Sequence, residues 1–278
     1  MLRSAAIALA VALGRLPAVP TLAAQAPAAP ADSVLAGPVV PDSLPRPAVA
    51  ADTLAPYIHS APPGHGIRWY EPLAVLGGIA LASTLDEPVA NHFRDHRSQT
   101  GQDIADAWSK VGTYGVGAVT AGVIAGGLIS HNEKVTHAGL RLLFSVGLAG
   151  GAAQGMKIVL GRERPYQNTS AWDFDPGHFD TSFPSGHTTL AFAMAASLSD
   201  DIHRTWATVG LYGLATGVAV SRVYQQAHWV SDVVGGAAVG ITSAKLVSGR
   251  WRVFGLTPPR FLIGARGPVI GWSLAFRE

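Results

Sequence analysis

Three short clusters of polar residues hold the side chains that could do chemistry in this chain of 278 residues. In the first cluster, six residues separate Lys157 from Arg164, which is followed by Pro165. Two cations that converge on one point repel each other, but with a phosphate they form a clamp, in which arginine is a planar fork and lysine a point charge. A basic helix terminus that only satisfies the helix dipole is the alternative for this cluster.

The second cluster, Pro184–His187, ends a polar loop and opens an apolar, helix-like run. Gly186 lets the backbone approach a ligand closely, and the free N–H groups of a helix start favour an anion, phosphate in particular. His187 can give or take a proton near neutral pH. The alternative is an ordinary helix start with Ser185 as its cap.

The third cluster contains Ser221 and Arg222, followed by His228 and Asp232. His228 and Asp232 are four residues apart at a predicted helix start, so they share one face. A carboxylate there can fix the tautomer of the imidazole and leave its other nitrogen as a nucleophile or base. Arg222 would supply a third cation. A buried His–Asp pair with only a structural role is the alternative.

Helices must bring these clusters together, and we predict six helical elements. They are Pro72–Leu85, Gly112–Ser130, Val135–Leu160, Thr188–Leu198, Trp206–Val220 and Trp229–Val247. Asp86–Gly101 is predicted as a polar connecting segment, Asp103–Lys110 as a short amphipathic helix and Gly161–Pro184 as a loop. Following the chain out and back along these helices returns it to one end of the bundle at every cluster. We therefore expect one site with three cations, a helix N-terminus and two histidines.

Together the clusters resemble the three-part signature of the type 2 phosphatidic acid phosphatase superfamily, which includes the vanadium haloperoxidases. The signature reads Lys-x6-Arg-Pro, Pro-Ser-Gly-His and Ser-Arg-x5-His-x3-Asp, and this chain matches it at every position. The resemblance covers about Pro72–Val247. It implies an all-α fold, a six-helix bundle that is embedded in or associated with a membrane.

The resemblance also implies roles for the site residues. His228 would attack phosphorus and form a phosphohistidine, Asp232 would orient His228, and His187 would protonate the leaving oxygen and then activate water. The equatorial oxygens would be bound by Lys157, Arg164, Arg222, the Ser185 hydroxyl and the Gly186 N–H. Because the cations replace a metal ion, no metal and no other cofactor is expected.

The composition fits closely packed helices. The chain is 48% hydrophobic and 14% charged, against about 25% charged in a typical soluble domain. Its 32 glycines favour helices packed through small residues, as in a membrane bundle, with a tightly packed soluble helical protein as the alternative. A net charge of +2 without a long basic run argues against nucleic acid as a partner, and the absence of cysteine excludes disulfides and thiol catalysis. His92 and His96 could ligate a metal, but a solvated segment is favoured.

The two ends of the chain differ from its core. Met1–Ala24 has a basic start, a short apolar stretch and small residues, as in an export signal that is cleaved, or kept as an anchor. Residues 25–66 form a Pro/Ala-rich linker, and residues 67–249 are the predicted phosphatase domain. In the tail, residues 250–278, the apolar runs Phe261–Ala265 and Val269–Phe276 predict a small β-hairpin.

The predicted membrane topology contains a conflict. A cleaved signal followed by six spans would put the site in the cytoplasm, whereas the basic residues after the last helix favour a cytoplasmic C-terminus and hence an outward-facing site. The conflict is resolved if Pro72–Leu85 does not cross, if the domain is exported and only membrane-associated, or if the signal is not cleaved. We favour a membrane-bound envelope enzyme with a periplasmic site, and a soluble periplasmic protein is the alternative.

The function expected from all of this is metal-independent hydrolysis of a phosphate monoester or diphosphate, with a lipid phosphate as the substrate. A soluble, exported acid phosphatase of broad specificity is the second hypothesis. A vanadate-dependent haloperoxidase, in which the same cations and His228 hold vanadate, is the third. A catalytically silent membrane protein that only binds phosphate or moves a phospholipid is the fourth. The oligomeric state is not predicted.

Overall fold

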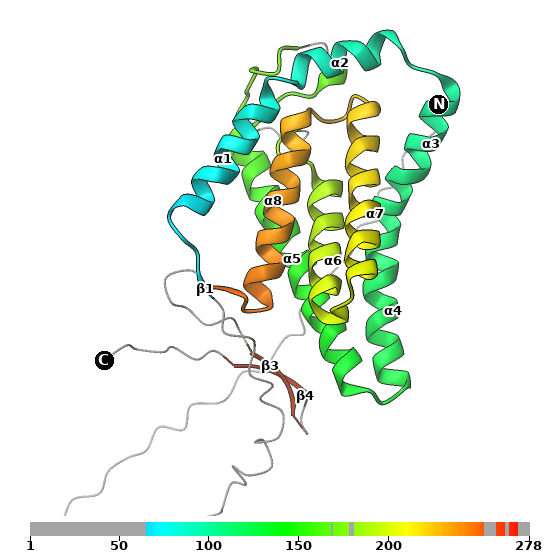
Figure 1. Ribbon diagram of the computed structural model, residues 1–278, viewed down its shortest axis with the longest axis vertical. Coiled ribbons are helices and arrows are strands. Elements are labelled where there is room, and N and C mark those ends of the chain that lie inside the picture. Colours follow the sequence, from blue (N-terminus) through cyan, green and yellow to red (C-terminus); the bar gives the residue numbers. More distant parts are fainter. Residues whose placement is uncertain (1–64, 168, 178–180, 253–259, 265–266, 272–278) are drawn as a thin grey trace, which may run out of the picture. The chain divides into compact units, whose positions relative to one another are not determined.

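The computed structural model describes residues 65–167, 169–177 and 181–252, together with two strands at 260–264 and 267–271. The predicted signal Met1–Ala24 and nearly all of the predicted linker 25–66 lie outside the described residues. The described part is almost wholly helical, which confirms the all-α class (Figure 1). Its helices are α1 (Tyr70–Ser83), α2 (Asp86–Asp95), α3 (Gln99–Lys110), η3 (Val111–Gly115), α4 (Val116–Ile129), α5 (Glu133–Leu160), η4 (Pro165–Gln167), α6 (Gly186–Ile202), α7 (Thr205–Tyr224) and α8 (Val230–Val247).

Each of the six predicted helical elements is present, but the prediction of a connecting segment at Asp86–Gly101 was wrong. This stretch contains α2 and the first turn of α3. Asp86 and Glu87 lie in the first turn of α2, where carboxylates stabilise the positive end of the helix dipole. Ala90 packs with the buried Trp229, and the Phe93 ring meets the Tyr224 ring at a centroid distance of 5.1 Å. Tertiary contacts therefore stabilise α2, a helix that the polar composition of this stretch did not predict.

Helices α3 and α4 form one nearly continuous helix, because the chain passes between them through the π-helical turn η3. The sequence prediction separated them near Gly112, at a glycine in a polar neighbourhood. Gly112 is instead buried against Val218 of α7, where a β-carbon would lie 2.6 Å from a Val218 methyl group. The glycine therefore permits close packing of this helix on α7 and does not end it.

Helix α6 is the centre of the bundle and packs against α5, α7 and α8 (Figure 1). The interface with α8 is formed by small residues. A β-carbon at Gly236 would lie 2.8 Å from the Ser185 carbonyl oxygen, and one at Gly240 would collide with the Thr189 carbonyl oxygen. The two helices thus approach each other closely through glycine, as the composition predicted.

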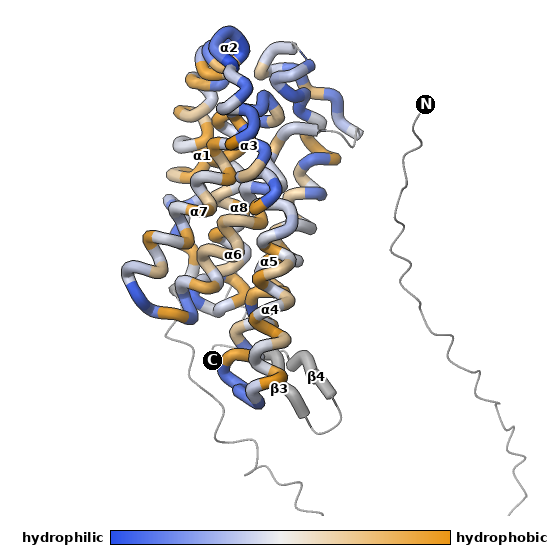
Figure 2. Tube along the Cα trace, turned by 90° about the vertical axis from the view of Figure 1, so that its right-hand side faces the viewer, coloured by the Kyte–Doolittle hydropathy of each residue, from blue (hydrophilic) through white to orange (hydrophobic). Residues whose placement is uncertain are grey.

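Three helices of the described region are long and apolar enough to cross a membrane. They are Gln99–Ile129, Glu133–Leu160 and Val230–Val247. Helices α1 and α2, bent by 40° relative to each other, make a fourth if the pair is one broken span. Large apolar side chains such as Leu81, Ile129 and Val159 are exposed, and hydrophobic residues run along α4 while α2 is hydrophilic (Figure 2). This arrangement is that of a membrane-bound protein.

Two small sheets accompany the helices. Strand β1 (His65–Gly66) pairs in parallel with β2 (Trp251–Arg252), which follows α8. Strand β3 (Arg260–Gly264) pairs antiparallel with β4 (Gly267–Gly271), with Gly264 opposite Gly267. The predicted hairpin is therefore present, with a second strand that begins at Gly267, before the predicted run Val269–Phe276. The end of that run, residues 272–276, lies outside the described residues.

Candidate active site

The first cluster lies where α5 ends. Lys157 is buried in the last turn of this helix, and its Nζ donates to the carbonyl oxygens of Thr181 and Ser182, the latter at 3.4 Å. The helix ends at Gly161, which has a φ of 62° and whose β-carbon would collide with the Asp175 carbonyl group. Only glycine fits this turn, which leads the chain away from Lys157 and into the loop that carries Arg164.

The arginines of the first and third clusters lie on the same side of the bundle. Nη1 of Arg164 donates to the Ala227 carbonyl oxygen at 3.1 Å, directly before His228. Nη1 of Arg222, at the end of α7, donates to the Ser109 hydroxyl of α3 at 2.7 Å and to the side chain of Gln225. Nε of Arg222 is buried and has no hydrogen-bond partner among the described residues. It is therefore a donor available to an anion.

The second cluster begins α6 and faces these cations. His187 lies outside the candidate spans, and its pKa is lowered to about 4, first by burial and then by the positive charges of Arg222, Arg164 and Lys157. All three predicted phosphate cations thus act on one imidazole. A β-carbon added at Gly186 would meet no atom within 4 Å, so the start of α6 is open to a ligand.

Ser185 does not act as the side-chain cap of α6. Its N–H donates to the Asp232 carbonyl oxygen at 3.0 Å, which ties the start of α6 to the start of α8. The buried Ser185 hydroxyl accepts a hydrogen bond from Thr188 at 2.9 Å and keeps its own proton for donation. This geometry differs from the ordinary helix cap that was the alternative for this cluster.

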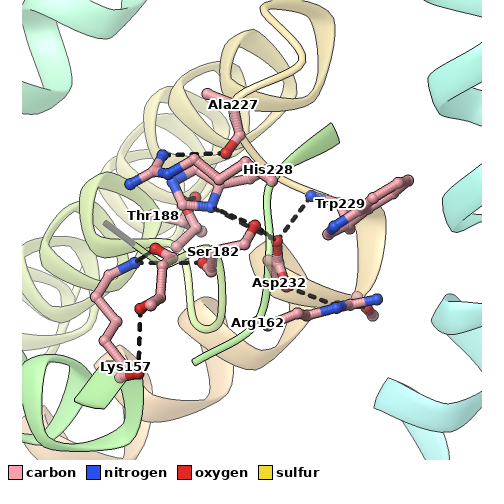
Figure 3. Close-up of polar contacts among 12 residues, drawn as sticks. Lys157, Arg162, Ser182, Thr188, Ala227, His228, Trp229 and Asp232 are labelled. Carbon is pink, nitrogen blue, oxygen red and sulfur yellow. Dashed lines mark hydrogen bonds and ion pairs between the residues drawn. The ribbon is translucent and has the colours of Figure 1, made fainter. Parts of the chain in front are cut away.

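His228 and Asp232 form the centre of the third cluster (Figure 3). His228 is buried, and its Nδ1 lies 3.6 Å from Oδ2 of Asp232 and 3.4 Å from the Ser182 hydroxyl, which itself donates to Oδ2. The pKa of His228 is lowered to about 4 because burial and the charges of Arg164 and Lys157 outweigh the attraction of Asp232. The imidazole is therefore neutral at pH 7, as a nucleophile must be.

Arg162 is a site residue that the sequence analysis missed. Its guanidinium donates to Oδ1 of Asp232 and to Oδ2 of Asp86, each at 2.7 Å, and Figure 3 shows it beside Asp232 on the side away from His228. Ser182 was missed as well. The only signal for Arg162 was a second arginine near Arg164, because its partner Asp86 is remote in the sequence.

Thr113 in η3 is a further contact that the sequence did not reveal. Its hydroxyl oxygen lies 2.6 Å from Nε2 of His187 and donates to the Ser109 carbonyl oxygen at 2.9 Å. Since a hydroxyl has one proton, the bond to Ser109 makes Nε2–H of His187 the donor to Thr113. Helix α3 and η3 therefore supply supports for both His187 and Arg222.

The structure brings every predicted site residue to the same end of the bundle, as the helix count required. His92 and His96 do not point to a metal: their rings stack with centroids 4.6 Å apart. Among the described residues, no group of three His, Asp or Glu side chains could hold a metal ion. The arrangement can bind a phosphate between three cations and a helix start, with one neutral histidine on each of two helix starts.

A comparison of sequences relates part of the chain to a known family. Residues 138–253 match the PAP2 superfamily, that of the type 2 phosphatidic acid phosphatases. The PAP2 segment contains α6, α7, α8, nearly all of α5 and all three clusters. Helices α1 to α4, with Asp86 and Thr113, precede it.

Curated PAP2 relatives are similar over parts of their length. A lipid A 1-phosphatase of Porphyromonas gingivalis is 39% identical over 106 residues, 37% of this chain and 21% of that protein. A putative undecaprenyl-diphosphatase of Escherichia coli, YbjG, is 34% identical over 96 residues, 34% of this chain and 46% of that protein. The matched residues thus span less than half the length of either relative.

A solved structure has the same fold. The transmembrane PAP2-type phosphatidylglycerolphosphate phosphatase of Bacillus subtilis superposes with a TM-score of 0.52 and 22% identity, over 65% of this chain and 95% of that one. The bundle described here therefore shares its fold with that phosphatase.

Proposed function

We propose that this chain hydrolyses a phosphate monoester or diphosphate of a lipid, without a metal ion, through a phosphohistidine on His228. We assign this activity to residues 67–249. The observation that carries the proposal is the position of His228: a neutral, buried imidazole held between Asp232 and the cations Arg164 and Lys157. The match of residues 138–253 to the PAP2 superfamily supports the same reaction class.

In the first step, Nε2 of His228 attacks phosphorus, because Nδ1 faces Asp232 and Ser182. A P–N bond forms while the P–O bond to the leaving group breaks, and His187 gives a proton to the departing oxygen. In the second step, water attacks the phosphohistidine and gives its proton to His187. Inorganic phosphate leaves and neutral His228 is restored.

Binding of the substrate phosphate solves a problem that this mechanism poses for His187. In the free enzyme, burial and three positive charges hold its pKa at about 4, so it is uncharged and cannot act as an acid. A bound phosphate dianion neutralises these charges and thereby raises the pKa of His187. Substrate binding therefore lets His187 take up the proton that it later gives to the leaving oxygen.

A lipid substrate is favoured by the apolar surroundings of the site. A groove of about 260 Å³ is lined by Trp108 and other apolar residues of α3 and η3, together with Leu214 of α7. A smaller cavity, of about 100 Å³, adjoins it and is lined by Gly112 and Val218. A β-carbon at Gly112 would lie 3.5 Å from the His187 ring, so this apolar space lies close to the acid. An alkyl chain can occupy it while its phosphate reaches His187.

The test is phosphate release by the purified, detergent-solubilised protein. The panel contains phosphatidic acid, phosphatidylglycerol phosphate, a polyprenyl diphosphate, a lipid A phosphate and a water-soluble aryl phosphate, each with and without a chelator. We expect turnover of at least one lipid phosphate, insensitivity to the chelator and no turnover by His228→Ala. No turnover on any phosphate ester contradicts the proposal, and equal rates on the aryl phosphate favour the acid phosphatase.

We propose further that the protein lies in the membrane of the cell envelope with the site facing the periplasm. Lys245, Arg250 and Arg252 lie at the end of α8 away from the site, and basic residues of this kind favour the cytoplasmic side. Because the chain has no cysteine, a single introduced cysteine is a unique label. Arg97→Cys, at the site end, should react with an impermeant thiol reagent in intact cells, and Lys134→Cys, at the other end, should not. The reverse result contradicts this orientation.

A further inference from the structure

Asp86 joins α2 to the start of α8 through buried polar contacts. It is the first residue of α2, directly after the break between α1 and α2, and it is almost fully buried. Its Oδ1 accepts the Ser231 N–H at 2.8 Å. Its Oδ2 accepts the Ser231 hydroxyl at 2.6 Å and Nη2 of Arg162 at 2.7 Å. The Asp86 carboxylate, which lies outside the PAP2 segment, is thus bound to Ser231, the residue directly before Asp232.

Arg162 connects this carboxylate to the one that faces His228. Nη1 donates to Oδ1 of Asp232 and to the Ser231 hydroxyl, each at 2.7 Å, and Nε donates to the Ala171 carbonyl oxygen at 2.9 Å. The guanidinium lies 5.6 Å from the centre of the Trp229 ring. Because Oδ1 is held by Arg162, Oδ2 is left for Ser182 and His228.

The charges in this cluster decide what Asp232 can do. Arg162 and Asp232 alone form a neutral pair, and a neutral pair gives little stabilisation to the positive charge that His228 gains when it attacks phosphorus. Asp86 adds a second carboxylate, so that Asp86, Arg162 and Asp232 together carry one net negative charge. That charge is buried, where it is poorly screened and acts more strongly than it would in water.

We infer that Asp86 and Arg162 are positioning residues for the nucleophile: Arg162 fixes the Asp232 carboxylate, and Asp86 neutralises Arg162 so that the charge of Asp232 acts on His228. This inference rests on the proposed function. We place neither residue in contact with the substrate, so each should affect the attack step and leave phosphate binding to Lys157, Arg164 and Arg222.

The test compares kcat and KM of the wild type, Asp86→Asn and the control Asp200→Asn. Asp200 also forms an ion pair, with Lys245 at 2.6 Å, but at the other end of α6. Removal of an outer group that orients a metal-binding histidine typically costs about 10- to 100-fold, and we take the same range for this nucleophilic histidine. We expect Asp86→Asn to lower kcat by about this factor with KM changed less than about twofold, and Asp200→Asn to keep the wild-type kcat. Equal kcat values for the two variants overturn the inference.

A double variant separates charge from structure. Asp86→Asn/Arg162→Gln removes one negative and one positive charge, and so restores the net charge of −1 while the glutamine amide can still donate to Asp232. We expect its kcat to exceed that of Asp86→Asn alone, a reversal that a purely structural role does not produce. A kcat at or below that of Asp86→Asn contradicts the charge argument. If the double variant does not fold, the single variants still decide.

The outcomes also distinguish this inference from the proposed function. No phosphate release by the wild type from any substrate of the panel refutes the function. Turnover by the wild type together with an unaffected Asp86→Asn refutes only the positioning role.

Discussion

Replacing Gly240 by alanine should damage the site from a distance. Gly240 is eight residues after Asp232 in α8, or about 12 Å along the helix. Its added methyl group would collide with the Thr189 carbonyl oxygen and lie 2.8 Å from the Ala193 nitrogen, both backbone atoms of α6. Backbone atoms cannot rotate away, so the two helices must separate.

The expected loss in the free energy of unfolding of Gly240→Ala follows from two opposing effects. Overpacking a tight interface costs about 1–3 kcal/mol, whereas glycine to alanine inside a helix gains about 1 kcal/mol. The net loss is up to about 2 kcal/mol. At about 2–4 °C per kcal/mol for a chain of this size class, Tm falls by up to about 8 °C. The loss of activity should be larger, because the same separation stretches the 3.0 Å bond from the Ser185 N–H to the Asp232 carbonyl oxygen.

This bond ties the helix start that carries His187 to the one that carries Asp232. A misplacement of about 1 Å between reacting groups can cost about 100-fold in rate. We therefore expect kcat of Gly240→Ala to fall by about 10- to 100-fold, measured as phosphate release beside thermal unfolding in the same detergent. Gly213→Ala in α7 is the matched control, since a β-carbon there meets no atom within 4 Å. Wild-type kcat and Tm in Gly240→Ala would refute the reasoning.

Three further predictions concern individual site residues. Thr113→Val removes the acceptor for Nε2–H of His187 and should lower kcat about tenfold, whereas Thr113→Ser should keep it; equal kcat values in both contradict this. Lys157→Met should lower kcat/KM by at least about 100-fold, as loss of one transition-state donor does, and a smaller loss excludes Lys157 from the phosphate site. The pKa of His228 falls from 6.5 to about 4 on folding, so between these pH values the unfolded chain binds the proton more readily than the folded chain. The contribution of His228 to the free energy of unfolding is therefore full above about pH 6.5 and is lost as the pH falls towards 4. Thermal unfolding of His228→Gln should show a smaller loss over this interval than the wild type.

The convergence of the three clusters was predictable because it needs only the direction of successive helices. Lys157 closes α5, Gly186 opens α6, Arg222 lies near the end of α7 and Asp232 lies in the first turn of α8. Errors of a few residues at helix ends do not change which end of the bundle each cluster occupies. The spacing of His228 and Asp232 likewise gave their proximity, although the structure inserts Ser182 between them.

The residues that support the site, Asp86, Arg162 and Thr113, were not predictable because their contacts join positions that are far apart in the sequence. Asp86 acts on Arg162 across 76 positions of sequence, and Thr113 acts on His187 across 74. No local pattern records such pairs. Asp86 also lies in a stretch whose polarity indicated a connecting segment, and the burial of Ala90 and the packing of Phe93 on Tyr224 stabilise it as a helix. The residues proposed to contact substrate were found by their chemistry, whereas the residues that hold them were found only in three dimensions.

The short pairing of β1 with β2 links the orientation of the site to the role of the first 24 residues. It fixes residue 65 beside residue 251, at the far end of α8, while Asp86 contacts Ser231 at its near end. Helix α1, of 14 residues, thus lies along α8. If α8 is a span and α1 crosses with it, the first of the three resolutions given above, in which Pro72–Leu85 does not cross, fails. A periplasmic site then places residue 65 in the cytoplasm. Because residues 25–66 are predicted as a tether that does not cross, Met1–Ala24 would not have carried the following chain outward. By the same argument, an active export signal implies a cytoplasmic site. The cysteine labels at Arg97 and Lys134 therefore test both the side that the site faces and whether Met1–Ala24 acts as an export signal.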